Sequence, residues 1–160
     1  MRLQLSKSAF DNVHLTPCIG NIQTLLLLSK NNLTMTTTDI KVMKTEEVAA
    51  RFHELAQQEK WFEIQDEFFS ENVKSIDPDG SPYMGYAEGK AAVRKKGEDF
   101  VNRIMAFHGA STTAPLVTGN YFAVGRKIDI TVEGHGRIQM DEIMLYEVKN
   151  GEIISEQFFY

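Results

Sequence analysis

The sequence has little of what disulfide-stabilised, membrane-spanning or nucleic-acid-binding proteins need. Its 160 residues include one cysteine, Cys18, which cannot form an internal disulfide bond. A chain of this length can bury roughly 70% of the surface that its unfolded form exposes, so it needs neither disulfide bonds nor a metal ion to fold. The longest apolar runs, such as Leu25–Leu28, are far shorter than the roughly 20 residues that cross a bilayer. We therefore expect no membrane partner.

Positive charge and cofactor-binding motifs are also scarce. Lys and Arg number 17 against 22 Asp and Glu, and the basic residues form only short runs such as Arg94–Lys96. A phosphate backbone requires a positive stripe, so nucleic acid is not expected as a partner. The chain contains no metal-ligand spacing such as Cys-x-x-Cys and no phosphate-binding loop that ends in Lys-Ser or Lys-Thr. We expect no metal, nicotinamide, ATP or other cofactor.

Residues 1–34 differ in charge from the rest of the chain. They carry three basic residues and one acidic residue, whereas residues 35–160 carry 14 basic and 21 acidic residues. They lack the unbroken apolar stretch of about 7 to 15 residues and the cleavage site of a secretory signal. A mitochondrial-type transit peptide fits less well because arginine is scarce. We predict a disordered extension or a misassigned start over residues 1–34, one domain over residues 35–160, and a cytoplasmic location.

Helical periodicity begins at Thr45. Thr45 can cap a helix, two glutamates follow in the first turn, where they suit the helix dipole, and apolar residues recur at helical spacing up to residue 59. The same spacing predicts a second helix through Trp61–Phe68 and a third over residues 88–104. Two prolines and a glycine predict a turn-rich loop over residues 77–82.

The second half of the chain alternates apolar and polar residues. This alternation predicts strands over residues 105–112, 122–132, 137–148 and 152–160. Asn150 and Gly151 predict a tight hairpin before the last strand, because both residues readily adopt positive φ angles. Three helices followed by antiparallel strands predict an α+β domain with the helices packed on one face of the sheet.

Three segments carry a family resemblance. They are residues 68–80 (FFSENVKSIDPDG), residues 89–94 (GKAAVR) and the closing hairpin at residues 146–154 (YEVKNGEII). In this order they resemble the nuclear-transport-factor-2-like superfamily, and within it the SnoaL-like and ketosteroid-isomerase-like branch. The resemblance covers about residues 45–160 and implies a cone of three helices packed on a strongly curved antiparallel sheet around an apolar pocket. That fold carries isomerases, dehydratases, cyclases, hydrolases and binding modules, so function must be argued from the site.

Asp77, which precedes a proline, is the first candidate for a catalytic residue. In the isomerases that the chain resembles, a similar Asp-Pro carries the general base that moves a proton next to a carbonyl group. A carboxylate at an apolar pocket suits this role because burial raises its pKa. The alternative is that Asp77 only organises an Asx turn. The tyrosine on the first helix of those isomerases is missing, because Phe52 and His53 occupy that stretch. His53 is a second candidate, as a donor or base.

Two glutamates interrupt apolar faces of the predicted strands. Glu142 lies on one strand and Glu156 on the last, and a charge in an apolar pocket is costly unless it is neutralised, paired or used. Both are therefore candidates for a proton donor or ligand anchor. The alternative is that these faces point outward, where Arg126 or Arg137 could pair with the glutamates. The residues expected to bind a ligand are Phe52, Trp61, His108, Met144, Tyr146, Phe158 and Tyr160.

These residues predict a protein that binds a small apolar, carbonyl-bearing or ring-shaped molecule. If it is an enzyme, we expect cofactor-free acid/base chemistry of an isomerase, cyclase or lyase, with Asp77 as the base. Glu142, Glu156 or His53 would then donate a proton or anchor the ligand. The alternative is a non-catalytic ligand-binding or dimerisation module.

Apolar strand residues also predict self-association. Phe122, Ile128, Ile130 and Phe159 are expected on the outer face of the curved sheet. An apolar face left in water favours association, so we predict a homodimer that buries this face.

Overall fold

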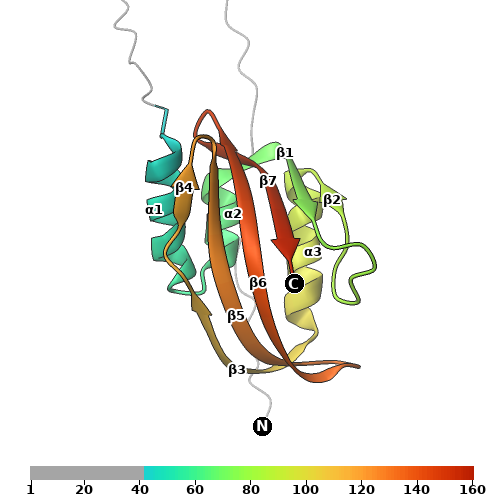
Figure 1. Ribbon diagram of the computed structural model, residues 1–160. Helices are drawn as coiled ribbons and strands as arrows, with labels where there is room; N and C mark the ends of the chain where they lie inside the picture. The colour runs from blue at the N-terminus through green and yellow to red at the C-terminus, as the bar shows by residue number, and fades with distance from the viewer. Residues whose placement is uncertain (1–41) are drawn as a thin grey trace, which may run out of the picture. The chain divides into compact units, whose positions relative to one another are not determined.

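The computed structural model describes residues 42–160, so Cys18 and the predictions for residues 1–34 and for a domain start at residue 35 lie outside this range. Within the described range, three helices lie on one side of a seven-stranded sheet (Figure 1). They are α1 (Thr45–Ala56), α2 (Trp61–Phe68) and α3 (Lys90–Asn102). The strands are β1 (Phe69–Ile76), β2 (Ala87–Glu88), β3 (Ile104–Thr112), β4 (Leu116–Thr118), β5 (Tyr121–Val132), β6 (Gly136–Lys149) and β7 (Glu152–Phe159). The predicted α+β cone is confirmed.

The sheet is mixed rather than antiparallel throughout. Its strand order is β2-β1-β7-β6-β5-β3, with β4 paired to β5, and β1 pairs with β7 in the parallel sense. The chain enters β1 between α2 and α3, so the helices do not all precede the strands as the sequence pattern predicted. The polar residue Ser75 occupies a fully buried position of β1, which hides the alternation that marks a strand.

The boundaries of α1 correct two local predictions. Thr45 is the first helical residue and not the cap, because the backbone N–H of the preceding Lys44 donates a 2.8 Å hydrogen bond to the Glu47 carboxylate. The helix ends at Ala56 and not at residue 59, where Glu59 has a φ of 56°. A positive φ cannot continue an α-helix, so the chain turns there towards α2.

The hairpin between β6 and β7 follows the sequence prediction. Asn150 and Gly151 have φ angles of 54° and 81°, as a tight hairpin of this kind requires. A register shift follows between Glu147 and Val148, opposite the start of β7. Ile153 is fully buried while Ile154 and Ser155 are half-buried, and Glu156 and Phe158 continue the buried face.

The helices cover the inner face of the sheet. At the end nearest α1, the rings of Phe52, Phe122 and Tyr146 pack together, with centroid distances of 4.6 to 5.1 Å. Phe52 and Phe122 are completely buried and Tyr146 almost completely. These rings form a close-packed core that fixes α1 against β5 and β6.

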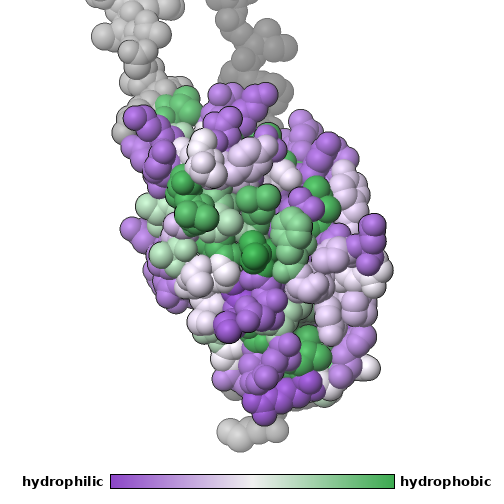
Figure 2. Space-filling view, viewed as in Figure 1, coloured by the Kyte–Doolittle hydropathy of each residue, from purple (hydrophilic) through white to green (hydrophobic). Residues whose placement is uncertain are grey.

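The outer face of the sheet carries a different set of apolar residues from those predicted. Phe122, Ile128 and Ile130 are buried on the inner face, because the alternation along β5 places them beneath the helices. Of the four residues named for this surface, only Phe159 is exposed, and it pairs across the strands with the exposed Ile143. Figure 2 shows apolar side chains gathered over the middle strands of this face.

Within residues 42–160, none of the helices has the length and apolar character needed to cross a membrane.

Candidate functional site

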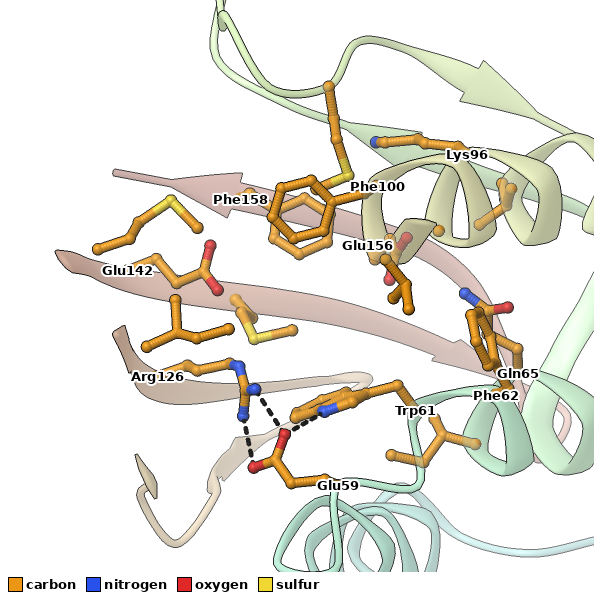
Figure 3. A pocket seen from close by; sticks show the side chains of 18 of the residues that line it. Glu59, Trp61, Phe62, Gln65, Lys96, Phe100, Arg126, Glu142, Glu156 and Phe158 are labelled. Carbon is orange, nitrogen blue, oxygen red and sulfur yellow. Dashed lines mark hydrogen bonds and ion pairs between the residues drawn. The ribbon is translucent and has the colours of Figure 1, made fainter. Parts of the chain in front are cut away.

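A cavity of about 420 Å³ lies between the inner face of the sheet and helices α2 and α3 (Figure 3). Most of its lining is apolar, and a volume of this size suits a small organic ligand. Its aromatic residues are Trp61, Phe62, Phe69, Phe100, Phe107, Tyr146 and Phe158. Its polar and charged residues are Glu59, Gln65, Lys96, Arg126, Glu142 and Glu156.

Glu142 lies on β6 and points into this cavity (Figure 3). Arg126 on β5 is its partner in the strand register, and both residues are buried. No residue in the described range 42–160 hydrogen-bonds to the Glu142 carboxyl group. Burial raises the pKa of Glu142 to about 7, against the attraction of Arg126 and with the repulsion of Asp77 and Glu156. Glu142 is therefore able to change protonation state near neutral pH.

Glu156 reaches the same cavity from β7. Its Oε1 accepts a 2.6 Å hydrogen bond from the Ser75 hydroxyl on β1. Burial raises the pKa of Glu156 to about 7, while the Ser75 hydrogen bond and the charge of Lys96 oppose that rise. Tyr146 pairs with Glu156 in the strand register, and burial raises the pKa of its hydroxyl well above 10. Tyr146 thus contributes a neutral hydroxyl beside two carboxyl groups.

Arg126 also lines the cavity, but its ion-pair partner is Glu59 and not Glu142 or Glu156. Its guanidinium donates hydrogen bonds of 2.7 and 3.2 Å to the Glu59 carboxylate and one of 3.1 Å to Thr112. It also lies over the Trp61 ring, 4.3 Å from the centroid, and the Trp61 indole N–H donates to Glu59 at 2.9 Å. The charge of Arg126 is thus balanced by Glu59, and Glu142 forms no ion pair with any other residue of the range 42–160.

Asp77 is buried beside the cavity and not in its lining. Its Oδ2 forms an ion pair with Lys96 of α3, and its Oδ1 accepts a 3.0 Å hydrogen bond from the Tyr160 hydroxyl. The Tyr160 hydroxyl also shares a 2.5 Å hydrogen bond with Ser81. Both oxygens of the Asp77 carboxylate are therefore engaged, and the aspartate holds the half-buried Lys96 in place.

The structure brings six of the residues predicted from the sequence into one cavity. They are Trp61, Glu142, Met144, Tyr146, Glu156 and Phe158. The two glutamates face inward, so the alternative in which Arg126 or Arg137 pairs with them on the outer face does not hold. Arg126 lies inward as well, and Arg137 pairs with Asp129 at the surface.

Five other predicted residues lie outside the cavity lining: Phe52, His53, Asp77, His108 and Tyr160. Phe52 belongs to the packed core beneath Tyr146. His53 is half-buried on α1, and its Nδ1 is buried without a hydrogen-bond partner in the described part of the chain. His108 is exposed at a register shift in β3 between Phe107 and Gly109. Its Nε2 forms a 2.9 Å hydrogen bond with the Thr131 hydroxyl.

Lys96 and Glu59 were not identified from the sequence, and Arg126 was considered only for the outer face. The spacing of buried residues along the chain could have identified Arg126 and Lys96. Arg126 occupies an inward position in the alternation of β5, between Val124 and Ile128. Lys96 lies three residues after the buried Val93 and so falls on the inner side of α3. Glu59 lies in a turn, where no periodicity applies.

Residues 42–160 contain no cluster of three or more His, Cys, Asp or Glu side chains that could hold a metal ion.

Comparisons with known proteins agree with this fold. A family profile for the SnoaL-like domain matches residues 43–160. A Mesorhizobium loti protein, designated a candidate SnoaL-like polyketide cyclase and also a carbohydrate phosphatase, is 34% identical, with a TM-score of 0.70. The similarity covers 74% of this chain and 100% of that protein. No curated protein matches this sequence.

Two further structures show the same fold at lower identity. A candidate isomerase from Bacillus subtilis is 23% identical, with a TM-score of 0.53 over 72% of this chain and 88% of its own. A protein from Catenulispora acidiphila with a ketosteroid-isomerase-like fold, in complex with trimethylamine, is 14% identical, with a TM-score of 0.56 over 73% and 87%. The profile match and the 34% identical relative together show that this chain belongs to the family of SnoaL-like domains.

Proposed function

We propose that the protein binds a small, largely apolar carbonyl compound in this cavity and catalyses a cofactor-free proton transfer on it, as an isomerase, cyclase or lyase. The observation that carries the proposal is the pair Glu142 and Glu156, two buried carboxyl groups in one apolar cavity with pKa values of about 7. A catalytic acid or base works best when its pKa lies near the working pH. The cyclase designation of the Mesorhizobium loti relative agrees with this chemistry.

Two coupled carboxyl groups with such pKa values share about one proton at neutral pH. The ionised group can remove a proton from the carbon next to a carbonyl group. The electrons of the broken C–H bond then move to the carbonyl oxygen. The protonated carboxyl group and the Tyr146 hydroxyl are the donors that can stabilise that oxygen.

This proposal moves the base from Asp77 to the glutamate pair. The Asp77 carboxylate is engaged by Lys96 and Tyr160 and does not line the cavity, whereas both glutamates do. A base has to come within hydrogen-bond reach of the proton that it removes. Asp77 therefore supports the site from behind the cavity wall.

The proposal is tested with 2-tetralone, a two-ring enolisable ketone, by following hydrogen–deuterium exchange next to its carbonyl group by NMR in D₂O. The protein should accelerate exchange above the buffer rate. Glu142→Gln and Glu156→Gln should each reduce that acceleration by about 100-fold or more, the usual contribution of a general acid or base. Asp141→Asn, which changes an exposed carboxylate on the other face of β6, is the matched control.

A wild-type exchange rate equal to that of buffer, with tetralone bound in the cavity, would support the non-catalytic binding module instead. Full exchange activity in both glutamine variants would contradict the catalytic role of the pair.

We also propose that the protein is a homodimer that buries the outer face of the sheet. The exposed residues Ile143 and Phe159 support this proposal, because they are adjacent across β6 and β7 on a face that none of the helices within residues 42–160 covers. Light scattering should give about twice the chain mass of 18.1 kDa, and Ile143→Glu should reduce it to the monomer value. A monomer mass for the wild-type protein at micromolar concentration would overturn the proposal.

A further inference from the structure

A buried chain of polar groups connects Glu156 to helix α3. The Ser75 hydroxyl lies 2.6 Å from Glu156 Oε1, and the Lys96 Nζ lies 2.7 Å from the same hydroxyl. Lys96 also pairs with Asp77, and the Lys96 side chain is 11% exposed while that of Asp77 is fully buried. Burying charged and polar groups costs free energy, and this chain of contacts acts on the ionisation of Glu156.

The direction of each hydrogen bond in this chain follows from the donors present. An ammonium group has hydrogens to donate and no lone pair to accept with, so the Ser75 oxygen accepts from Lys96. Ser75 has one hydroxyl hydrogen, and its other partner is Glu156 Oε1. That hydrogen therefore goes to Glu156, which accepts it best as a carboxylate.

Asp77 holds in position Lys96, the lysine whose hydrogen bond to Ser75 sets the donor direction along this chain. Its Oδ2 binds Lys96, and its Oδ1 accepts from the Tyr160 hydroxyl at the edge of the domain. The Lys96 ammonium also lies 5.3 Å from the centroid of the Phe158 ring, on the cavity side. The lysine is thus held between β1, β7 and its own helix, in one position relative to Ser75.

Glu142 has no such support. Its register partner Arg126 is engaged by Glu59 and Thr112, and no residue in the described part of the chain donates a hydrogen bond to the Glu142 carboxyl group. Arg126 attracts the Glu142 carboxylate, but burial outweighs that attraction. A buried carboxyl group that receives no hydrogen bond is more stable when it is protonated.

We propose that Lys96, acting through Ser75, holds Glu156 in the ionised form while Glu142 carries the proton, so that Glu156 is the base of the cavity and Glu142 its acid. Lys96 is a positioning residue, since it acts through Ser75. The assignment of base and acid rests on the proposed function, whereas the difference in ionisation follows from the contacts alone.

The proton and electron balance of this assignment suits an isomerisation. Glu156 takes a proton from the carbon next to the carbonyl group, and the electron pair of that bond forms the enolate, whose oxygen accepts a hydrogen bond from Glu142. Glu156 then returns the proton to another carbon of the conjugated enolate while the carbonyl group re-forms. Both glutamates end in their starting protonation states, so no cofactor or second reactant is required.

Several charged groups from neighbouring elements act on the two glutamates. Glu156 is affected by Lys96 from α3, by Asp77 at the end of β1, and by Tyr146 and Glu142 from β6. The Ser75 hydrogen bond and the charge of Lys96 favour the ionised form of Glu156, and Asp77 opposes it. Glu142 is attracted by Arg126 from β5 and repelled by Asp77 and Glu156. Removing Lys96 should therefore move the titration of Glu156 more than that of Glu142.

The test is a site-resolved pH titration of the ligand-free, full-length protein, with ¹³C-labelled glutamate carboxyl groups observed by NMR. Spectra of Glu142→Gln and Glu156→Gln assign the two signals. Both pKa values lie near 7, and we expect Glu156 to titrate below Glu142 in the wild-type protein, because the Ser75 hydrogen bond and the Lys96 charge favour the Glu156 carboxylate. Lys96→Met should raise the Glu156 midpoint by about one unit or more, and Ser75→Ala, which removes the hydrogen bond through which Lys96 acts, should raise it by at least as much.

Lys95→Met is the matched control, because Lys95 is the neighbouring lysine on α3 but is exposed and pairs with Asp99. It should leave both midpoints unchanged. If Lys96→Met does not fold, Lys96→Met/Asp77→Asn removes both buried charges together, and the Glu156 midpoint should still rise. Equal midpoints in the wild-type protein, a lower midpoint for Glu142, or an unchanged Glu156 midpoint in the folded Lys96 and Ser75 variants would overturn the inference.

The titration requires no turnover, so its outcome is independent of the tetralone experiment. Loss of tetralone exchange with the expected midpoints would reject the proposed function and leave the ionisation difference standing. Exchange activity with equal midpoints would support the function and reject the role of Lys96.

Discussion

The inner face of the sheet has two ends that use the same strands differently. Near α1, β5 and β6 contribute Phe122 and Tyr146, whose rings pack against Phe52, and Tyr146 also borders the cavity. Four residue pairs further along, the same strands contribute Arg126 and Glu142, which line a cavity of about 420 Å³. One end is a core of aromatic rings in contact, and the other is a largely apolar cavity with several charged side chains in its lining.

Along β5 and β6, the residues that stabilise the fold thus lie at one end and the residues of the candidate site at the other. Close packing of apolar groups stabilises a fold, whereas a cavity and buried charges reduce its stability. The packed end can therefore stabilise the domain against the cost of the cavity end. We expect substitutions at the two ends to differ in size and, for the glutamates, in sign.

The largest effect is expected at the packed end. Phe52→Ala removes a fully buried ring and should lower the free energy of unfolding by about 4 kcal/mol. Phe100→Ala, at a half-buried residue that lines the cavity, should cost about 1 kcal/mol, because its ring already borders empty space. Urea unfolding measures both values. Similar losses for the two variants would show that the cavity end is packed as tightly as the α1 end.

A slightly smaller loss is expected at the ion pair behind the cavity. Asp77→Asn leaves the buried Lys96 ammonium without its counter-charge and should lower the free energy of unfolding by about 3 kcal/mol at pH 7. Asp79→Asn, at an exposed residue of the same loop, is the control and should change it little. An Asp77→Asn protein as stable as the wild type would show that the ion pair contributes nothing to folding.

The smallest effect has the opposite sign and depends on pH. Because burial raises the pKa of Glu142 to about 7, the folded state binds more protons than the unfolded state between the ordinary glutamate pKa and about 7. Stability from this group is therefore present at low pH and is lost as the pH rises through about 7. Glu142→Gln removes that loss, so it should stabilise the protein at pH 8 by roughly 2 kcal/mol relative to its effect at pH 4.

Thermal or urea unfolding at the two pH values measures this change, and Asp141→Asn is the exposed control on the same strand. A Glu142→Gln effect that is independent of pH would show that Glu142 titrates as an ordinary exposed glutamate.

Much of the fold could be predicted from local sequence. The spacing of apolar residues predicted α1, α2 and α3, and the alternation of β5, β6 and β7 predicted three long strands, because these periods depend only on backbone geometry. The turn at Asn150 and Gly151 was predicted for the same reason. Strand β1 was not predicted, since its buried position Ser75 is polar and its parallel partner β7 lies about 80 residues further along the chain.

The candidate site could be predicted only in part. Glu142 and Glu156 were identified because a charge on an otherwise apolar strand face is unusual. Asp77 was expected at the pocket as a catalytic base, whereas it lies outside the cavity lining, and its pairing with Lys96 depends on how α3 lies against β1. Lys96 belongs to a basic run that resembles an ordinary solvated helix surface.

The sequence by itself determined the helices, the long strands, the family and the presence of two acidic residues on apolar strand faces. These features follow from residue type and from spacing along the chain, which act over a few residues. Only the tertiary structure decided that both glutamates face one cavity, that Arg126 pairs with Glu59, and that Lys96 reaches Glu156 through Ser75. Hydrogen bonds and ion pairs act over about 3 Å in space, so partners that are 20 to 80 residues apart in sequence meet only when the helices lie on the curved sheet.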